Sequence, residues 1–152
     1  MKDKPTNELD SMLDGMRPDQ LDGYYKENMD YLANGKKAFY YYMKDIIEAK
    51  KIRLMDVYSY AGVSESYGAQ IFRMEKPTKN RDLIIRFCVA GHLSLYETNR
   101  ALKLYGMPAL YSKDKRDAAL IVAIQNRIYD LADIDDILEK QGFLPLSAIN
   151  SD

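Results

Sequence analysis

Apolar residues recur along this chain at the spacing of one face of an α-helix. Between residues 54 and 61, Leu54, Val57, Tyr58 and Ala61 occupy positions i, i+3, i+4 and i+7, which lie on the same side of a helix. No segment alternates apolar and polar residues with the period of two that a half-buried strand shows. The pattern therefore predicts an all-α fold.

Three more segments of the central region carry the same helical period. Residues 37–51 and 81–92 each predict one helix. Ser94 and Glu97 form a Ser-x-x-Glu capping box that begins a further helix, which Gly106 and Pro108 end. Together with residues 54–61 and 65–74, these segments predict a unit of five helices.

The connection after residue 61 is short enough to predict a helix-turn-helix. Gly62 ends the first helix, because glycine tolerates the left-handed backbone found just past a helix end. Val63 is an apolar plug in the turn, and Ser64 is a favourable N-cap for a second helix from Glu65 to Met74.

Residues 51–74 resemble the helix-turn-helix of the XRE family, the group of Cro and phage-repressor-like proteins. The positions that carry the resemblance are Ile52, Asp56, Val57, Gly62, Val63 and Ser64. The resemblance implies a repressor-like five-helix domain whose second motif helix, the recognition helix, enters the major groove of DNA. Nearly the whole chain is also similar to a group of uncharacterised bacterial helix-turn-helix proteins, which brings no established activity with it.

The sequence departs from the family pattern at four positions. Tyr58 stands where the family has a small alanine, and Gly68 stands where the recognition helix carries Ile or Val. Since these positions pack against each other in that fold, we interpret the pair as a compensated exchange that conserves core volume. Leu54 replaces a glutamine that often contacts the DNA backbone, and Met74 replaces the glycine that usually ends the recognition helix.

Further helices are predicted on both sides of the repressor-like domain, which spans residues 36–108. Residues 1–35 form an acidic N-terminal arm with one or two short helices, the second capped by Asp19 or Asp22 and ended by Asn34 and Gly35. Residues 109–152 form a C-terminal helical extension, packed on the domain or on a dimer mate.

Two helices and an apolar tail are expected in this extension. Ser112 is the expected cap of the first helix, whose stretch 118–124 is apolar all round. Such a helix is buried on several sides, so we expect a central strut or half of a dimer interface. Asp130 caps the last helix, and an apolar tail that contains Phe143, Leu144 and Leu146 is expected to fold back.

Charge is distributed unevenly along the 152 residues, although the net charge is only −1. Residues 1–35 carry four basic and eight acidic side chains, residues 36–128 carry 17 and nine, and residues 129–152 carry one and six. Because electrostatic attraction to phosphate decays within about 8 Å at physiological salt, the basic centre matters more than the total. This block coincides with the helix-turn-helix, which favours a nucleic-acid partner.

Candidate chemistry of other kinds is sparse, and we expect no enzyme activity, no cofactor and no bound metal. Cys88 and His92 lie four residues apart, a conceivable nucleophilic pair, but Cys88 falls in an apolar stripe where cysteine is normally inert. Asp133, Asp135 and Asp136 lack the glycine-bearing loop of a calcium motif, so a solvated acidic face is the simpler interpretation.

Several features favour a cytoplasmic protein. One cysteine excludes an internal disulfide and fits a reducing compartment. No signal peptide is visible, and the longest apolar run, residues 118–124, is too short to span a bilayer.

The resemblance to the XRE family implies which residues would contact double-stranded DNA. The base-facing candidates are Glu65, Ser66, Tyr67 and Gln70, and the phosphate-contact candidates are Arg73, Lys76, Lys79 and Arg81. Gln70 can pair with adenine through two hydrogen bonds, whereas Glu65 can accept from cytosine but is repelled by phosphates. Four phosphate contacts predict a salt slope of about −3.6 per monomer, and a two-fold homodimer on a palindromic site is expected.

The alternative is a helix-turn-helix scaffold that serves as a protein-protein interaction adaptor. Leu54 at a DNA-contact position, Glu65 at the helix entrance and the acidic termini favour this alternative. The acidic arm could bind a protein partner, or it could cover the basic face and mimic DNA. The operator sequence, the choice between activation and repression, and any effector stay open at this point.

Overall fold

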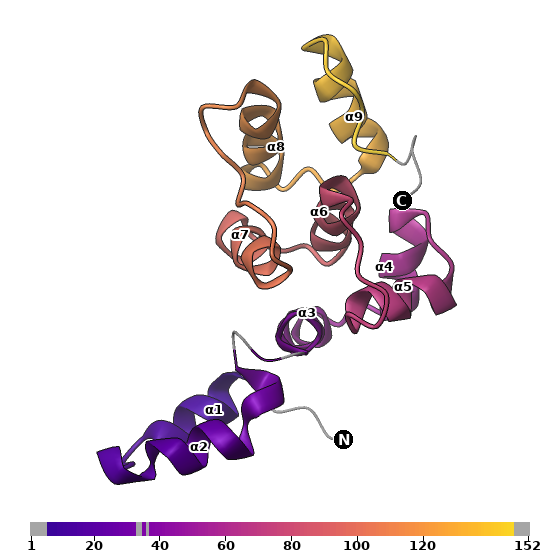
Figure 1. The fold of residues 1–152 in the computed structure, drawn as a ribbon. Coiled ribbons are helices and arrows are strands. Elements are labelled where there is room, and N and C mark those ends of the chain that lie inside the picture. Colours follow the sequence, from indigo (N-terminus) through magenta and orange to yellow (C-terminus); the bar gives the residue numbers. More distant parts are fainter. Residues whose placement is uncertain (1–5, 33–34, 36, 148–152) are drawn as a thin grey trace.

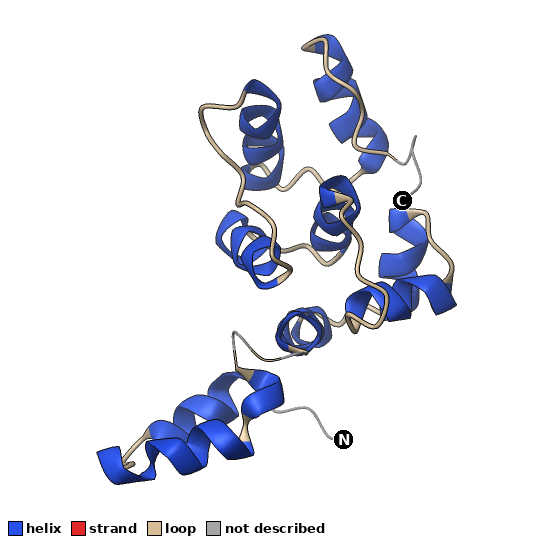
Figure 2. Cartoon of the chain, viewed as in Figure 1, coloured by secondary structure: helices blue, strands red, loops and turns tan. Residues whose placement is uncertain are grey.

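The computed structural model of the protein describes residues 6–32, 35 and 37–147. The prediction of an all-α fold is confirmed, because these residues form nine α-helices, two short 3-10 helices and no strand (Figure 1 and Figure 2). The α-helices are α1 (Thr6–Leu13), α2 (Leu21–Glu27), α3 (Ala38–Ala49), α4 (Leu54–Ala61), α5 (Glu65–Phe72), α6 (Arg81–Ala90), α7 (Leu95–Leu104), α8 (Lys115–Gln125) and α9 (Leu131–Lys140). The 3-10 helices are η1 (Pro18–Gln20) and η2 (Met29–Tyr31).

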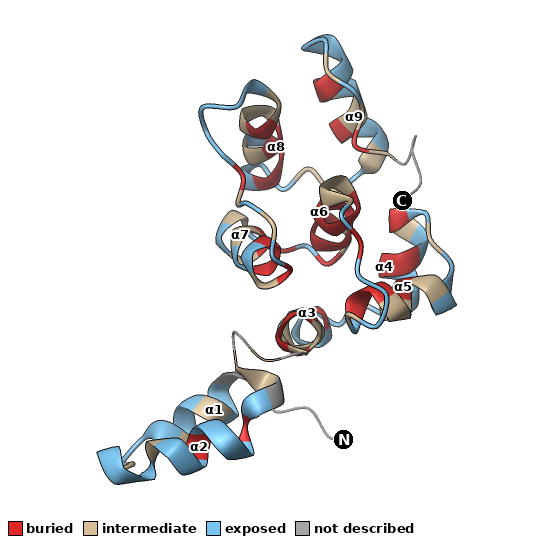
Figure 3. Cartoon of the chain, in the orientation of Figure 1, coloured by how far each residue is buried: buried red, intermediate tan, exposed pale blue. Residues whose placement is uncertain are grey.

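The hydrophobic core is built around α6. All residues of α6 from Leu83 to Val89 are buried, and buried side chains from α3, α4, α5, α7, α8 and α9 complete the same core (Figure 3). The central strut is therefore α6, whereas the sequence pattern assigned this role to residues 118–124. The central-strut prediction is wrong for α8, because Val122 is 54% exposed and the helix buries only one side. Three of the seven residues 118–124 are alanines, whose small side chains need little burial. The alternative, that this helix is half of a dimer interface, stays a prediction.

The C-terminal extension packs on the rest of the chain. Leu120, Ile134 and Leu146 belong to the common core, so residues 109–147 cover the domain itself. The tail folds back as expected, with Leu146 fully buried and Phe143 partly buried, but Leu144 is 69% exposed.

A buried arginine joins this tail to the helix-turn-helix. Arg86 is only 3% exposed, and its guanidinium donates hydrogen bonds to the carbonyl of Ala61 at 3.0 Å and to the carbonyl of Leu146 at 2.8 Å. The first of these carbonyls ends α4, where helix carbonyls lack intrahelical partners and attract a cation. α6, α4 and the tail therefore meet at one charged group.

Some of the predicted helix caps are present and others are corrected. Ser94 accepts a hydrogen bond from the Glu97 N–H in the expected capping box, and Asp130 caps α9. Ser112 does not cap α8. Asp114 does so instead by accepting from the Asp117 N–H, which starts the helix two residues later than a Ser112 cap would.

The start and end of α2 also differ from the prediction. α2 follows η1 directly, with Gln20 at its N-cap position and no side-chain cap, so neither Asp19 nor Asp22 has the expected role. The helix ends at Glu27, before Gly35, and Asn34 lies outside the described residues.

The N-terminal arm is a pair of helices that docks on α3 (Figure 1). The Tyr31 ring of η2 lies 4.4 Å from the Tyr41 ring of α3, centroid to centroid. The arm lies on the far side of α3 from the C-terminal helices α8 and α9, and Glu65 and Ser66 of α5 are exposed. This placement gives no support to the idea that the arm mimics DNA over the recognition helix.

Candidate nucleic-acid interface

The turn between α4 and α5 forms as the sequence predicted. Gly62 adopts the left-handed conformation with φ of 79°, and the Val63 N–H donates to the carbonyl of Tyr58 at 3.1 Å. Ser64 caps α5, because its hydroxyl accepts from the Tyr67 N–H at 3.1 Å. These contacts set the direction in which α5 leaves the turn.

The inner side of α5 rests directly on Tyr58 of α4. A Cβ added at Gly68 would lie 2.5 Å from Cδ1 and 2.7 Å from Cγ of the Tyr58 ring, well inside the ordinary carbon-carbon contact of roughly 3.5–4.0 Å. The two positions face each other as the compensated exchange requires. The missing side chain at Gly68 leaves the space that the Tyr58 ring fills.

The outer side of α5 carries the predicted base-contact candidates. Glu65 and Ser66 are exposed, and Tyr67 and Gln70 are partly buried. Ser66, Gln70 and Arg73 follow at i, i+4 and i+7, which places them on one face of the helical turn. This face presents a hydroxyl, an amide and a guanidinium in turn, and the Glu65 carboxylate lies beside its beginning.

The recognition helix is shorter than predicted, since α5 ends at Phe72 and not at Met74. Met74 takes the left-handed conformation with φ of 60°, the conformation that glycine usually supplies at this position in the XRE pattern. The N–H groups of Glu75 and Lys76 both donate to the carbonyl of Gln70, at 3.0 and 3.2 Å. The turn that a glycine would make is therefore present without one.

Three of the four phosphate-contact candidates point to the solvent. Arg73, Lys76 and Lys79 are exposed, and the guanidinium carbon of Arg73 lies 5.5 Å from the centroid of the Tyr40 ring on α3. Lys44 lies over the same ring, also at 5.5 Å. Tyr40 therefore gathers two cations beside the end of α5.

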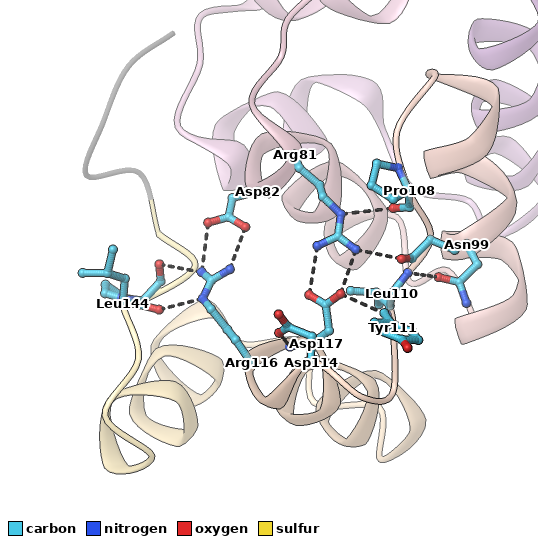
Figure 4. A network of polar contacts seen from close by, with 12 residues as sticks. Arg81, Asp82, Asn99, Pro108, Leu110, Tyr111, Asp114, Arg116, Asp117 and Leu144 are labelled. Atoms are coloured by element: carbon cyan, nitrogen blue, oxygen red, sulfur yellow. Dashed lines mark hydrogen bonds and ion pairs between the residues drawn. The ribbon is translucent and has the colours of Figure 1, made fainter.

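Arg81 is used inside the protein and leaves the set of phosphate-contact candidates. Its guanidinium forms two hydrogen bonds to the Asp117 carboxylate, both 2.9 Å long, and donates to the carbonyls of Pro108 and Ala109 at 3.1 and 3.0 Å (Figure 4). Asp117 also accepts from the Tyr111 N–H at 2.9 Å. Burial opposes ionisation of Asp117, but these hydrogen bonds and Arg81 outweigh it and hold its pKa below the usual range.

A second ion pair lies beside the first. In this pair α8 supplies the arginine and α6 supplies the aspartate, the reverse of the first pair. Arg116 of α8 donates two hydrogen bonds of 2.9 Å to Asp82 of α6, and it also reaches the carbonyls of Leu144 and Pro145, each at 3.2 Å (Figure 4). Consecutive residues at the start of α6 thus pair with consecutive residues at the start of α8. The network fixes the C-terminal extension to α6, the helix that follows the segment containing Lys76 and Lys79.

Sequence reasoning missed two basic residues near this surface. Arg53 stands at the N-cap position of α4, with a side chain 76% exposed, and pairs with Asp56 at 3.0 and 3.1 Å. Lys44 was assigned only to the polar side of a helix, although it flanks Tyr40. The sequence offered a signal for Arg53, because a basic residue stands directly before the first helix of the helix-turn-helix. It offered none for Lys44, because only folding brings this residue near the surface of α5.

Cys88 and His92, the conceivable nucleophilic pair, lie in different surroundings in the structure. Cys88 is fully buried, and burial raises the pKa of its thiol. His92 is exposed and stacks on the Tyr129 ring at 3.8 Å, and partial burial together with Lys50 lowers its pKa. In the described part of the chain, no group of three or more His, Cys, Asp or Glu side chains could hold a metal ion.

The three aspartates of α9 lie in different surroundings. Asp133 is exposed, Asp136 pairs with Lys140 at 2.9 Å, and Asp135 accepts hydrogen bonds from the N–H groups of Leu146 and Ser147 at 2.6 and 3.1 Å. Asp135 therefore holds the C-terminal tail against α9.

Comparisons with known proteins return no relative for this chain: no family model, no curated protein and no solved structure matches it. Across the described residues, no helix combines the length and the apolar content that crossing a membrane requires.

Proposed function

We propose that the protein is a sequence-specific regulator of transcription that binds double-stranded DNA through α5. The observation that carries this proposal is the outer face of the α4–α5 motif. Exposed Glu65 and Ser66 and partly buried Gln70 precede exposed Arg73, Lys76 and Lys79, so hydrogen-bonding groups for base edges lie next to cations for the phosphate backbone.

The support behind α5 suits this role. A recognition helix must be held in a fixed direction, and the Ser64 cap, the Tyr58–Gly68 contact and the packing of Phe72 on Phe39, with ring centroids 5.5 Å apart, hold α5 against α4 and α3. With Arg81 turned inward, three phosphate contacts remain. They predict a salt slope of about −2.7 per monomer, at −0.9 per contact.

One observation favours the adaptor alternative. Met55 in the first turn of α4 is 56% exposed, beside the partly buried Leu54. In the helix-turn-helix mode the first motif helix crosses the DNA backbone. Apolar side chains there suit a protein surface better than a phosphate.

Selection of bound duplexes from a random DNA pool tests the proposal. The selected duplex is then titrated at several salt concentrations with the Gln70→Ala and Lys79→Ala variants. We expect Gln70→Ala to relax the preference at one base position, with a loss of about 1–3 kcal/mol on the selected sequence. Lys79→Ala should weaken binding to all sequences and reduce the salt slope by about one.

Lys140→Ala is the matched control for charge, because Lys140 is an exposed lysine on α9, outside the α4–α5 motif. Its salt slope should equal that of the unaltered protein. If no sequence is enriched, and binding is weak and equal for every duplex, the regulator proposal is wrong and the adaptor alternative takes its place.

A further inference from the structure

Two consecutive residues of α3 meet two consecutive residues at the end of α5. Phe39 and Phe72 are fully buried, with ring centroids 5.5 Å apart. The next residue along each segment forms a second contact nearer the surface, in which the guanidinium carbon of Arg73 lies 5.5 Å from the centroid of the Tyr40 ring. Because the close-packed phenylalanine pair fixes the distance between the two backbones, Tyr40 and Arg73 are brought together in a set arrangement.

The charge of Arg73 is not balanced by an acid. Arg53, Arg81 and Arg116 each form an ion pair with an aspartate. In the part of the chain that the structure describes, the side chain of Arg73 has no ion pair and no hydrogen bond, and it contacts the Tyr40 ring instead. A guanidinium over an aromatic ring keeps its charge and its N–H donors, whereas a carboxylate neutralises the charge and accepts from those donors. Tyr40 therefore orients Arg73 and leaves its donors available.

Lys44 lies over the same ring but is placed differently. It follows Tyr40 by one turn of α3, is partly buried, and has its ammonium 3.9 Å from the Glu48 carboxylate. Its position is thus set within one helix, and its charge is partly balanced. Arg73 is exposed and directly follows α5, so it is the cation that the ring presents to the solvent.

We propose that Tyr40 is a positioning residue of the DNA interface and holds Arg73 in place to donate to a phosphate beside the end of α5. This inference rests on the DNA-binding function proposed above. A long side chain loses rotamer entropy when it is fixed on a partner, and this loss weakens binding. Because the Tyr40 ring restricts Arg73 in the free protein, part of that entropy is already lost before DNA binds. The interface thereby extends from α5 to α3, an element outside the α4–α5 motif.

A double-mutant cycle on DNA affinity tests the positioning role. Tyr40→Leu removes the aromatic face and should weaken binding about twofold to fivefold, the value of one exposed cation–π contact. Tyr40→Phe keeps the face and should bind as the unaltered protein does. In an Arg73→Ala background, Tyr40→Leu should have no further effect. Since a phosphate contact carries no sequence information, the loss should be equal on the selected duplex and on an unrelated duplex.

Tyr42→Leu is the matched control, because Tyr42 is another partly buried tyrosine of α3 that lies near residues of α7. It should leave the affinity for both duplexes unchanged, and circular dichroism checks that every variant is folded. A second measurement needs neither DNA nor a variant. In the NMR spectrum of the unaltered protein, nuclear Overhauser effects should join the ring protons of Tyr40 to the side chain of Arg73.

The positioning role is refuted if Tyr40→Leu weakens binding as much in the Arg73→Ala background as it does alone, or if the nuclear Overhauser effects are absent. It is also refuted if Tyr40→Phe binds as weakly as Tyr40→Leu, or if Lys44→Ala reproduces the loss while Arg73→Ala causes none. The proposed function fails on a different result, because selection then enriches no sequence, and the cycle can still be completed on the unrelated duplex. If the unaltered protein binds neither duplex, both proposals are wrong.

Discussion

The contact between Gly68 and Tyr58 predicts that even one added methyl group on α5 destabilises the fold. A Cβ at position 68 would lie 2.5 Å from Cδ1 of Tyr58, about 1 Å inside the usual contact distance. The clashing atoms are at the base of the ring and not at its flexible end. The ring itself packs edge-on against Phe72 and Phe87, with centroid distances of 5.3 and 6.2 Å, so rotation of the ring cannot relieve the overlap cheaply.

The magnitude follows from two opposing effects. Overpacking of a core typically costs about 1–3 kcal/mol, while replacing a mid-helix glycine with alanine gains about 0.8–1 kcal/mol of helix propensity. Because the overlap at 2.5 Å is severe, the overpacking cost should lie in the upper part of this range, about 2–3 kcal/mol. We therefore expect Gly68→Ala to lower the free energy of unfolding by about 1–2 kcal/mol and Gly68→Val by roughly 3 kcal/mol. For a chain of this length, the alanine variant should melt roughly 3–6 °C lower.

A double-mutant cycle with Tyr58→Ala isolates the contact. The single change Tyr58→Ala removes a buried ring and should cost about 3–5 kcal/mol. Combined with Gly68→Val it recreates the small-facing-large arrangement of the XRE pattern, so the double variant should be more stable than the sum of the two losses by about 2 kcal/mol. Urea unfolding followed by circular dichroism measures all four proteins.

Gly23→Ala is the matched control, because Gly23 also lies within a helix but a Cβ there would have no atom within 4 Å. This variant should be as stable as the unaltered protein or more stable. If Gly68→Ala behaves like Gly23→Ala, or if the single losses add to within about 0.5 kcal/mol, the steric reasoning is refuted.

Three further predictions concern the ion pairs and the helix ends. Asp117→Asn should lower the free energy of unfolding, measured by urea titration at pH 7, by about 3 kcal/mol, because it leaves Arg81 in a partly buried site without its counter-charge. Asp114→Asn changes an exposed cap position and should cost less than Asp117→Asn in the same titration. The pKa of Asp117 is lowered on folding, so its contribution to stability is present above the unfolded pKa near 3.9 and is lost as the pH falls through the lower folded pKa. The urea midpoint should therefore fall below about pH 4, and this fall should be smaller in Asp117→Asn. An equal fall in both proteins would show that other carboxylates cause it. Arg127→Gly should raise the melting temperature and increase the free energy of unfolding by about 0.5–1 kcal/mol. The reason is that Arg127 takes φ of 56° at an exposed helix end and glycine relieves this strain. Arg127→Ala keeps the strain, so an equal gain in both variants would contradict the prediction.

Local sequence determined the elements of this protein and the turn at its centre. The helical period, the Gly62–Ser64 turn and the caps at Ser64, Ser94 and Asp130 were readable because each depends on residues within one or two helical turns. The pairing of Tyr58 with Gly68 was also predictable, since a large residue and a missing side chain stand at positions that the helix-turn-helix brings together. The same local reasoning failed at the start of α8, where two acceptors, Ser112 and Asp114, compete within three residues and the chain uses the second.

Tertiary structure alone decided which residues are available for binding. Arg81 and Lys79 are near neighbours in a basic segment, yet Arg81 turns inward to Asp117, 36 positions away, while Lys79 remains exposed. A cavity between the N-terminal arm and helices α3 and α7 is likewise lined by tyrosines from α2, α3 and α7, and no periodicity within one helix can show that these residues meet. The physical reason is that a charged or aromatic side chain finds its lowest free energy with the partner that packing brings near, and packing of distant segments is a property of the whole fold.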